Sequence, residues 1–81
     1  MINSEWLHID WTDVYNQLGN IVNKMRNQWI HMTKDKLCNK ADITFASILR
    51  ARKMNKMRIK TINKLKKIGI FVKIIENPIE N

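Results

Sequence analysis

Ten lysine and arginine side chains, and no acidic one, lie between Ile43 and Ile75 of this 81-residue chain. The part from Met1 to Asp42 balances five basic residues against five acidic ones. Charges of one sign repel each other, and an anionic partner such as a phosphate backbone relieves that repulsion. The charge pattern therefore favours a nucleic-acid partner, and a lysine-rich soluble surface is the plainer alternative. The ten basic residues are Arg50, Arg52, Lys53, Lys56, Arg58, Lys60, Lys64, Lys66, Lys67 and Lys73.

Residues that could carry catalysis or hold a metal are sparse. His8 and His31 have no cysteine or paired carboxylate nearby at metal-ligand spacing, and two glycines cannot build a phosphate-binding loop. The single cysteine, Cys38, excludes an intrachain disulfide and a cysteine-rich zinc site. We expect Cys38 to be a packed thiol, although its neighbouring lysines could instead lower its pKa. The sequence thus predicts no enzyme, no cofactor and no metal.

The chain has the length of one domain. We divide it into an N-terminal extension (1–10) of unassigned role, a helical domain (11–69) and a C-terminal strand and tail (70–81). The N-terminus has no apolar run typical of a secretory signal, and the longest apolar stretch is too short to span a bilayer. A cytoplasmic protein that does not bind membranes is therefore expected.

Four helices are predicted from apolar spacing and from the residues that cap helices. The first runs from Asp10 to Met32, with Val14, Leu18, Ile21, Val22, Met25 and Trp29 on one stripe. The other three run from Lys34 to Lys40, from Phe45 to Arg52 or Lys53, and from about Ile59 to Ile68. Thr33 and Thr44 are the expected N-caps, Gly69 closes the last helix, and Lys53 to Arg58 forms a basic loop.

The tail from Ile70 to Ile75 is rich in β-branched residues and is predicted to be a strand. With no other strand expected in the chain, the simplest partner is the same strand of a second copy. The alternative is a tail that packs on the first helix. The dimer strand would consist of Ile70, Phe71, Val72, Lys73, Ile74 and Ile75.

The two short helices and the turn between them carry a family pattern, which stands here as Thr33-Lys34, Leu37-Cys38, Ala41-Asp42-Ile43-Thr44, Ile48 and Arg50. Ile62, Leu65 and Gly69-Ile70 match the last helix of the same pattern. From about Met25 to Ile70 the chain resembles the Cro/CI (XRE, lambda-repressor-like) helix-turn-helix family. It departs from the family in three places: Asp42 replaces the turn glycine, Asn55 stands where a loop glycine is usual, and the last helix is one residue short.

The resemblance implies an all-α helix-turn-helix bundle of four to five helices with a short C-terminal strand, acting as a sequence-specific, repressor-like regulator on double-stranded DNA. The recognition helix would span about 44–53 and enter the major groove. The positions that would read bases are Thr44, Phe45, Ala46, Leu49 and Arg50. Those that would contact the DNA backbone are Thr33, Lys34, Lys53, Asn55, Lys56 and Arg58.

Plainer interpretations remain open for several of these residues. Phe45 could be a core residue, and Arg50 could be a solvated helical arginine. Trp6, Trp11 and Trp29 lie outside the basic half, and we expect them in the core or an interface and not as a platform for stacked bases. At the level of function, the alternatives are a protein-interaction module that keeps the fold without DNA, an antitoxin-like component with a toxin partner, and a basic helix on anionic membrane.

Overall fold

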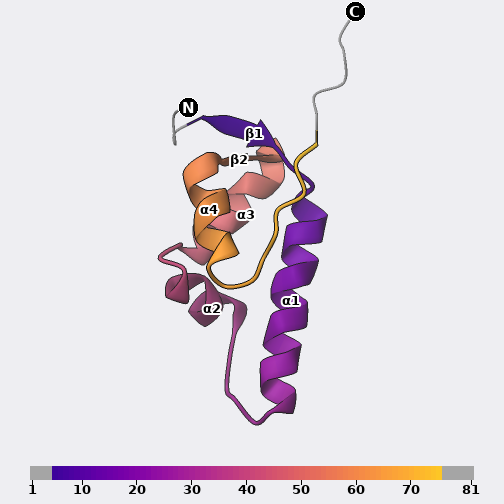
Figure 1. The fold of residues 1–81 in the computed structure, drawn as a ribbon, viewed down its shortest axis with the longest axis vertical. Coiled ribbons are helices and arrows are strands. Elements are labelled where there is room, and N and C mark those ends of the chain that lie inside the picture. The colour runs from indigo at the N-terminus through magenta and orange to yellow at the C-terminus, as the bar shows by residue number, and fades with distance from the viewer. Residues whose placement is uncertain (1–4, 76–81) are drawn as a thin grey trace, which may run out of the picture.

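The computed structural model describes residues 5–75, which form a mostly helical domain with a small two-stranded sheet (Figure 1). The helical class and the positions of four helices agree with the sequence prediction. The parts of the extension and tail at 1–4 and 76–81 lie outside the described residues. In chain order the elements are β1 (Trp6–His8), α1 (Trp11–Asn27), α2 (Lys34–Lys40), α3 (Phe45–Met54), β2 (Lys56–Arg58) and α4 (Ile59–Lys66).

Helix α1 begins where it was predicted and ends five residues earlier. The Asp10 carboxylate accepts a hydrogen bond from the backbone N–H of Asp13, at 3.2 Å. At the other end the N–H of Ile30 donates a hydrogen bond to the carbonyl oxygen of Met25, and the chain turns there before it runs on to α2. Trp29 was predicted on the buried stripe, and this is wrong: it lies in the turn at φ 66° with its side chain 95% exposed. Met32, which lies in the connecting loop and not in the helix, is nevertheless buried in the core.

Helices α2 and α3 are short and joined by a tight turn at 41–44. The hydroxyl oxygens of Thr33 and Thr44 accept from the N–H groups of the third residue on, as predicted for N-caps. Asp42 has φ 62°, a left-handed conformation that asparagine, aspartate and glycine tolerate best. Helix α3 extends to Met54, and Asn55, which stands where a loop glycine is usual, ends it in a left-handed conformation that asparagine tolerates.

The N-terminal extension forms half of the small sheet. β1 pairs antiparallel with β2, with Trp6 opposite Arg58, Leu7 opposite Met57 and His8 opposite Lys56. The prediction of a loop from Lys53 to Arg58 is therefore wrong, since its second half is strand. A strand of three residues is too short to show a period in sequence, and it forms here because β1 folds over it.

The tail pairs with its own chain. Ile74 forms a single bridge with Ile9, Ile75 N–H bonds to His8 O, and the Gln17 side chain both donates to and accepts from the Phe71 backbone. The predicted strand over 70–75 and its lack of an internal partner are therefore wrong. The tail runs beside α1, which was the alternative, because helix α4 stops at Lys66 and Gly69 (φ 88°) redirects the chain (Figure 1).

One continuous apolar core holds α1–α4 and the sheet together. The buried core residues are Ile9, Val14, Leu18, Val22, Met32, Leu37, Cys38, Ala41, Ile43, Ile48, Ala51, Met57, Ile62, Leu65 and Ile70.

No helix in the part of the chain described here is long and apolar enough to cross a membrane.

Candidate nucleic-acid interface

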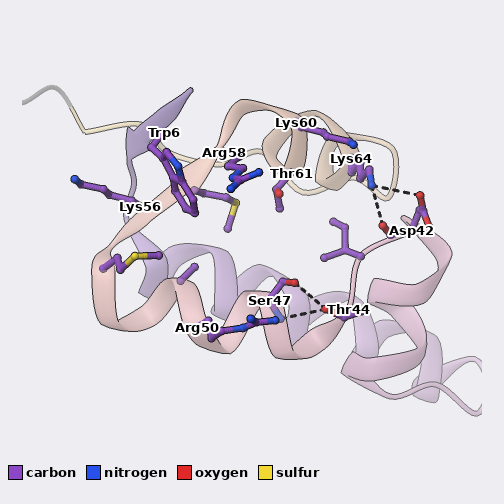
Figure 2. Close-up of a pocket in the computed structure, with 14 residues that line it drawn as sticks. Trp6, Asp42, Thr44, Ser47, Arg50, Lys56, Arg58, Lys60, Thr61 and Lys64 are labelled. Carbon is purple, nitrogen blue, oxygen red and sulfur yellow. Dashed lines mark hydrogen bonds and ion pairs between the residues drawn. The ribbon is translucent and has the colours of Figure 1, made fainter. Parts of the chain in front are cut away.

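A basic groove lies between α3 and α4 and is closed at one end by β1 and β2 (Figure 2). Its volume is about 500 Å³. Its lining combines cationic, hydroxyl and apolar side chains, of which Trp6 comes from the N-terminal extension and the others from the helical domain. The lining residues are Trp6, Asp42, Ile43, Thr44, Ser47, Arg50, Ala51, Met54, Lys56, Met57, Arg58, Lys60, Thr61 and Lys64.

The charge of this groove is strongly positive. Five lining residues are lysine or arginine, and Asp42 is the one acid among the lining residues described. The Asp42 carboxylate pairs with the Lys64 ammonium at 3.3 Å, and Lys64 also donates to the Asp42 carbonyl oxygen at 3.1 Å. The carboxylate side chain is 94% exposed, so water screens this pair and its contribution to stability is small. The other cations of the groove remain available to an anionic ligand.

Helix α3 presents an exposed face next to the groove. Ile48 and Ala51 point into the core, whereas Ala46, Leu49, Arg50 and Lys53 are exposed. Residues at spacings of three and four share one face of a helix, so these four exposed side chains form a single stripe. We call Ala46, Leu49, Arg50 and Lys53 the outer face of α3. It combines two small or apolar side chains with two cations.

Contacts from α1 fix the position of α3. The indole Nε1 of Trp11 donates a 2.7 Å hydrogen bond to the carbonyl oxygen of Ile48, in the middle of α3. The Trp11 ring stacks on Tyr15, with the centroids 4.9 Å apart. The Arg52 guanidinium lies 5.6 Å from the centroid of the Trp11 ring. The inner side of α3 is thus bound to α1, and the outer face is left to solvent.

Phe45 does not belong to the outer face. It is partly buried and packs against the core, with its ring centroid 6.5 Å from that of Tyr15. This position against the core does not support the prediction that Phe45 reads bases, and it is close to the alternative of a core residue. Its place at the first turn of α3 explains the difference, because that turn faces α1 and α2.

The predicted contact residues are divided among the basic groove, the outer face of α3 and a second hollow. Thr44, Arg50, Lys56 and Arg58 line the basic groove, and the exposed Asn55 lies at the end of α3 beside it. Phe45, Thr33 and Lys34 instead line a second hollow of about 410 Å³ against α1. The Lys34 ammonium lies there 5.0 Å from the centroid of the Tyr15 ring.

No family model, curated protein or solved structure matches this chain. Its function must therefore be inferred from the groove and from the outer face of α3.

Trp6 is the aromatic residue of the site, and the sequence analysis did not assign it there. It was expected in the core or an interface, away from the basic half, but it is 44% exposed and lines the basic groove. The Arg58 guanidinium lies 4.9 Å from the centroid of its ring. Lys60, Thr61 and Lys64 of α4 were also not assigned to the site. Only the pairing of β1 with β2 brings Trp6 to the basic residues, and no local pattern in the sequence indicates that pairing.

Cys38 lies in the core and not in either hollow. Burial raises the pKa of its thiol to about 11, and the negative charge of Asp35 adds to the increase. The expected packed thiol agrees with this, and the alternative of a lowered pKa is wrong. Within residues 5–75, no three histidine, cysteine or acidic side chains come together as a metal site would require.

Proposed function

We propose that the protein is a sequence-specific double-stranded DNA-binding regulator of the repressor type, with α3 as its recognition helix. The observation that carries this proposal is the outer face of α3, which is exposed along its length and borders a basic groove. The major groove of B-DNA is wide enough to admit an α-helix, and an exposed helix face can reach the base edges there. The cations of the groove and of the following strand would then lie along the phosphate backbone.

The arrangement of α2 and α3 supports a helix-turn-helix of the Cro/CI type. Leu37 and Ala41 from the first helix, Ile43 from the turn and Ile48 from the second are all buried together. Such shared packing makes the two helices a rigid unit, which a recognition helix needs in order to fix the register of its side chains. The family membership and the lambda-repressor-like topology are part of this proposal.

The outer face and the neighbouring groove residues suggest a role for each exposed side chain. Ala46 and Leu49 would contact thymine methyl groups, and Arg50 would bind a guanine through its two parallel N–H groups. Lys53, Lys56 and Arg58 would contact phosphates. The Thr44 hydroxyl lies 2.7 Å from that of Ser47 at the start of α3, where a phosphate would also meet the helix N-terminus.

A homodimer is part of the same proposal. Phe71, Ile74 and Ile75 are exposed large apolar side chains on the described part of the tail. Their burial against the same surface of a second copy would stabilise a twofold dimer and set the spacing of two DNA half-sites. The contact would be made by side chains, since backbone groups around Ile74 already pair with the segment from His8 to Asp10.

A protein-interaction role is the second candidate, and one observation favours it. Trp29 is 95% exposed and Ile30 44% exposed in the loop between α1 and α2, which lies at the opposite end of the molecule from the sheet (Figure 1). Tryptophan is enriched among the residues that dominate protein interfaces. A toxin or another protein could bind there while the outer face of α3 stays accessible.

Fluorescence anisotropy with a pool of random DNA duplexes at several salt concentrations tests the proposal. We expect binding that weakens steeply with salt and a selected sequence that binds more tightly than the pool. Arg50→Ala should reduce affinity for the selected sequence alone, whereas Lys56→Ala should weaken all duplexes and reduce the salt slope by about one. Lys24→Ala, an exposed change on α1, is the control. Unchanged affinity in both test variants, or no duplex binding at low salt, would overturn the proposal.

A further inference from the structure

We propose that the basic groove binds an unpaired nucleotide of a single-stranded segment, with the base stacked at the Trp6–Arg58 pair. This activity goes beyond the proposed function. Duplex recognition depends on the outer face of α3, whereas this site depends on Trp6 of β1. The two share the groove cations Arg50, Lys56 and Arg58, so the experiment below uses Trp6, to which the proposed duplex contact assigns no role.

The shape of the groove is the first argument. A hollow of about 500 Å³ has the size of sites that hold a small organic ligand, and it is bordered by α3, α4 and the sheet. Bases inside a duplex are stacked on their neighbours and present only their edges. An indole in the wall of a hollow can therefore stack on a base only if that base is unpaired.

The cross-strand pair of Trp6 and Arg58 supplies a stacking surface. The two residues lie opposite each other in the register of β1 and β2, which places their side chains on one face of the sheet. The guanidinium lies 4.9 Å from the indole centroid, and 44% of Trp6 is exposed. Tryptophan rings and arginine planes are both surfaces on which proteins stack single-stranded bases.

Backbone contacts hold this pair in place. Ile59 N–H donates to Glu5 O at 3.0 Å, and Ile9 N–H donates to Asn55 O at 2.9 Å, so β1 is fastened on both sides of Trp6. Met57, between Lys56 and Arg58, is buried in the core and fixes which face of β2 points outward. The indole is thus presented to the groove before any ligand arrives, which lowers the entropy lost on binding.

The remaining lining matches the other parts of a nucleotide. Met54 and Ala51 give the groove an apolar side, and a methionine sulfur makes favourable contacts with an aromatic ring. Arg50 comes from α3 and Lys60 from α4, so cations stand on both walls where the sugar-phosphate chain would pass (Figure 2). Asp42, the one acid among the lining residues described, lies at the Thr44 end and is paired with Lys64.

Binding of labelled 12-nucleotide strands to the whole chain, followed by anisotropy, tests the inference. Oligo-dT and oligo-U are compared with a duplex of equal length, and the DNA and RNA strands show which source of unpaired nucleotide is preferred. We expect Trp6→Ala to weaken binding of at least one strand by about 5- to 100-fold and duplex binding by less than about twofold. Trp29→Ala, which removes an exposed indole at the opposite end of the molecule, should change neither.

Two further variants guard against an effect on folding. Trp6→Phe keeps an aromatic ring and should retain most of the single-strand affinity, whereas Trp6→Leu keeps an apolar side chain in β1 and should lose it. Equal affinities for Trp6→Leu, Trp6→Phe and the wild type would overturn the inference. So would an equal loss of strand and duplex binding in Trp6→Leu at an unchanged melting temperature.

A polyanion without bases completes the test. Poly-glutamate of matched charge should displace oligo-dT much less well than unlabelled oligo-dT does. Equal displacement would show a general polyanion or acidic-peptide site and would overturn the inference. Loss of duplex binding with intact strand binding would reject the regulator proposed above and leave this site standing, and the reverse result would do the opposite.

Discussion

The indole Nε1 of Trp11 donates a hydrogen bond of 2.7 Å to the main-chain oxygen of Ile48, and so joins the first turn of α1 to the middle of α3. The two residues are 37 positions apart, and Ile48 is itself fully buried. The bond fixes the rotation of α3 about its own axis, because it ends on a backbone atom. The direction in which Ala46, Leu49, Arg50 and Lys53 point therefore depends on Trp11.

Trp11→Phe should destabilise the fold by about 1 kcal/mol and leave the chain folded. Phenylalanine preserves the stack on Tyr15 but removes the N–H donor, and a single hydrogen bond contributes about this much. For a domain of this size the melting temperature should fall by about 4–8 °C in a thermal scan followed by circular dichroism. An unchanged melting temperature would show that the indole N–H adds nothing to the packing of α3.

Phe45→Ala should reduce stability and leave sequence preference unchanged. The ring is partly buried between α1, α2 and α3, and its loss should cost about 1–3 kcal/mol, below the range for fully buried aromatic residues. Phe45→Leu should recover much of that loss, since it restores apolar volume. The readouts are urea unfolding and the duplex sequence selected from a random pool. A changed selected sequence would place Phe45 at the DNA after all.

The local features of the fold were predictable from sequence, and particular residues show why. Thr33 and Thr44 cap helices through bonds to residues three positions on, and Asn55 ends α3 by its own left-handed conformation. Each of these depends on a few adjacent residues, so each can be seen in a short stretch of sequence. The spacing of Val14, Leu18 and Val22 likewise predicted the buried side of α1.

The parts that sequence analysis missed depend on contacts between distant segments. Trp6 reaches the basic groove only because β1 crosses over to β2, 50 residues later in the chain. Tail residue Ile74 pairs with Ile9, and no periodicity in either segment indicates that bridge. Phe45 was assigned by its position in a family pattern, while its exposure is set by Tyr15 on another helix. The cations of the site were therefore predictable in kind, but its aromatic wall was not.

Asp42→Gly should be at least as stable as the wild type, and Asp42→Ala should be about 1 kcal/mol less stable. The residue has φ 62°, a conformation that costs an ordinary L-residue roughly 1–2 kcal/mol and glycine almost nothing. Both variants lose the exposed ion pair with Lys64, which contributes little, so their difference isolates the backbone effect. Urea unfolding of the three proteins measures it. The opposite order would mean that the Asp42 carboxylate, and not its backbone, decides the stability of this turn.

The stability of the protein should fall between pH 9 and 11 through Cys38. Burial raises the pKa of this thiol from its ordinary value of 9.0 to about 11 in the folded chain. Below pH 9 both states hold the proton and the full stability is present. Above pH 9 the unfolded chain loses the proton first, so stability declines until the folded thiol also ionises. The total decline from this group is on the order of 2–3 kcal/mol.

Cys38→Ser is the matched variant for that decline, because its hydroxyl does not ionise in this range. Lysine and tyrosine titration affects both proteins alike, so the difference between their unfolding free energies reports on the thiol. The wild type should be more stable at pH 8.5, and its advantage should shrink by roughly 1.5–2 kcal/mol at pH 10.5. A difference that stays constant with pH would show that the thiol ionises equally in both states.

Replacing Phe71 and Ile74 together by serine should convert a dimer into a monomer without unfolding the chain. Both side chains are at least half exposed, and neither belongs to the buried core. Their removal should therefore cost the monomer little, whereas a dimer interface built on them would lose the apolar area that holds it together. The hydrogen bonds between the Gln17 side chain and the Phe71 backbone do not require the phenylalanine ring, so the tail should keep its course along α1.

Sedimentation equilibrium at tens of micromolar should give about twice the chain mass for the wild type and one chain mass for the variant. Trp29→Ser removes a comparable exposed apolar side chain at the opposite end of the molecule, and it should remain dimeric. A monomeric wild type would contradict the proposed homodimer. A dimer that survives the double substitution and is lost in Trp29→Ser would place the interface at Trp29 and not at the tail.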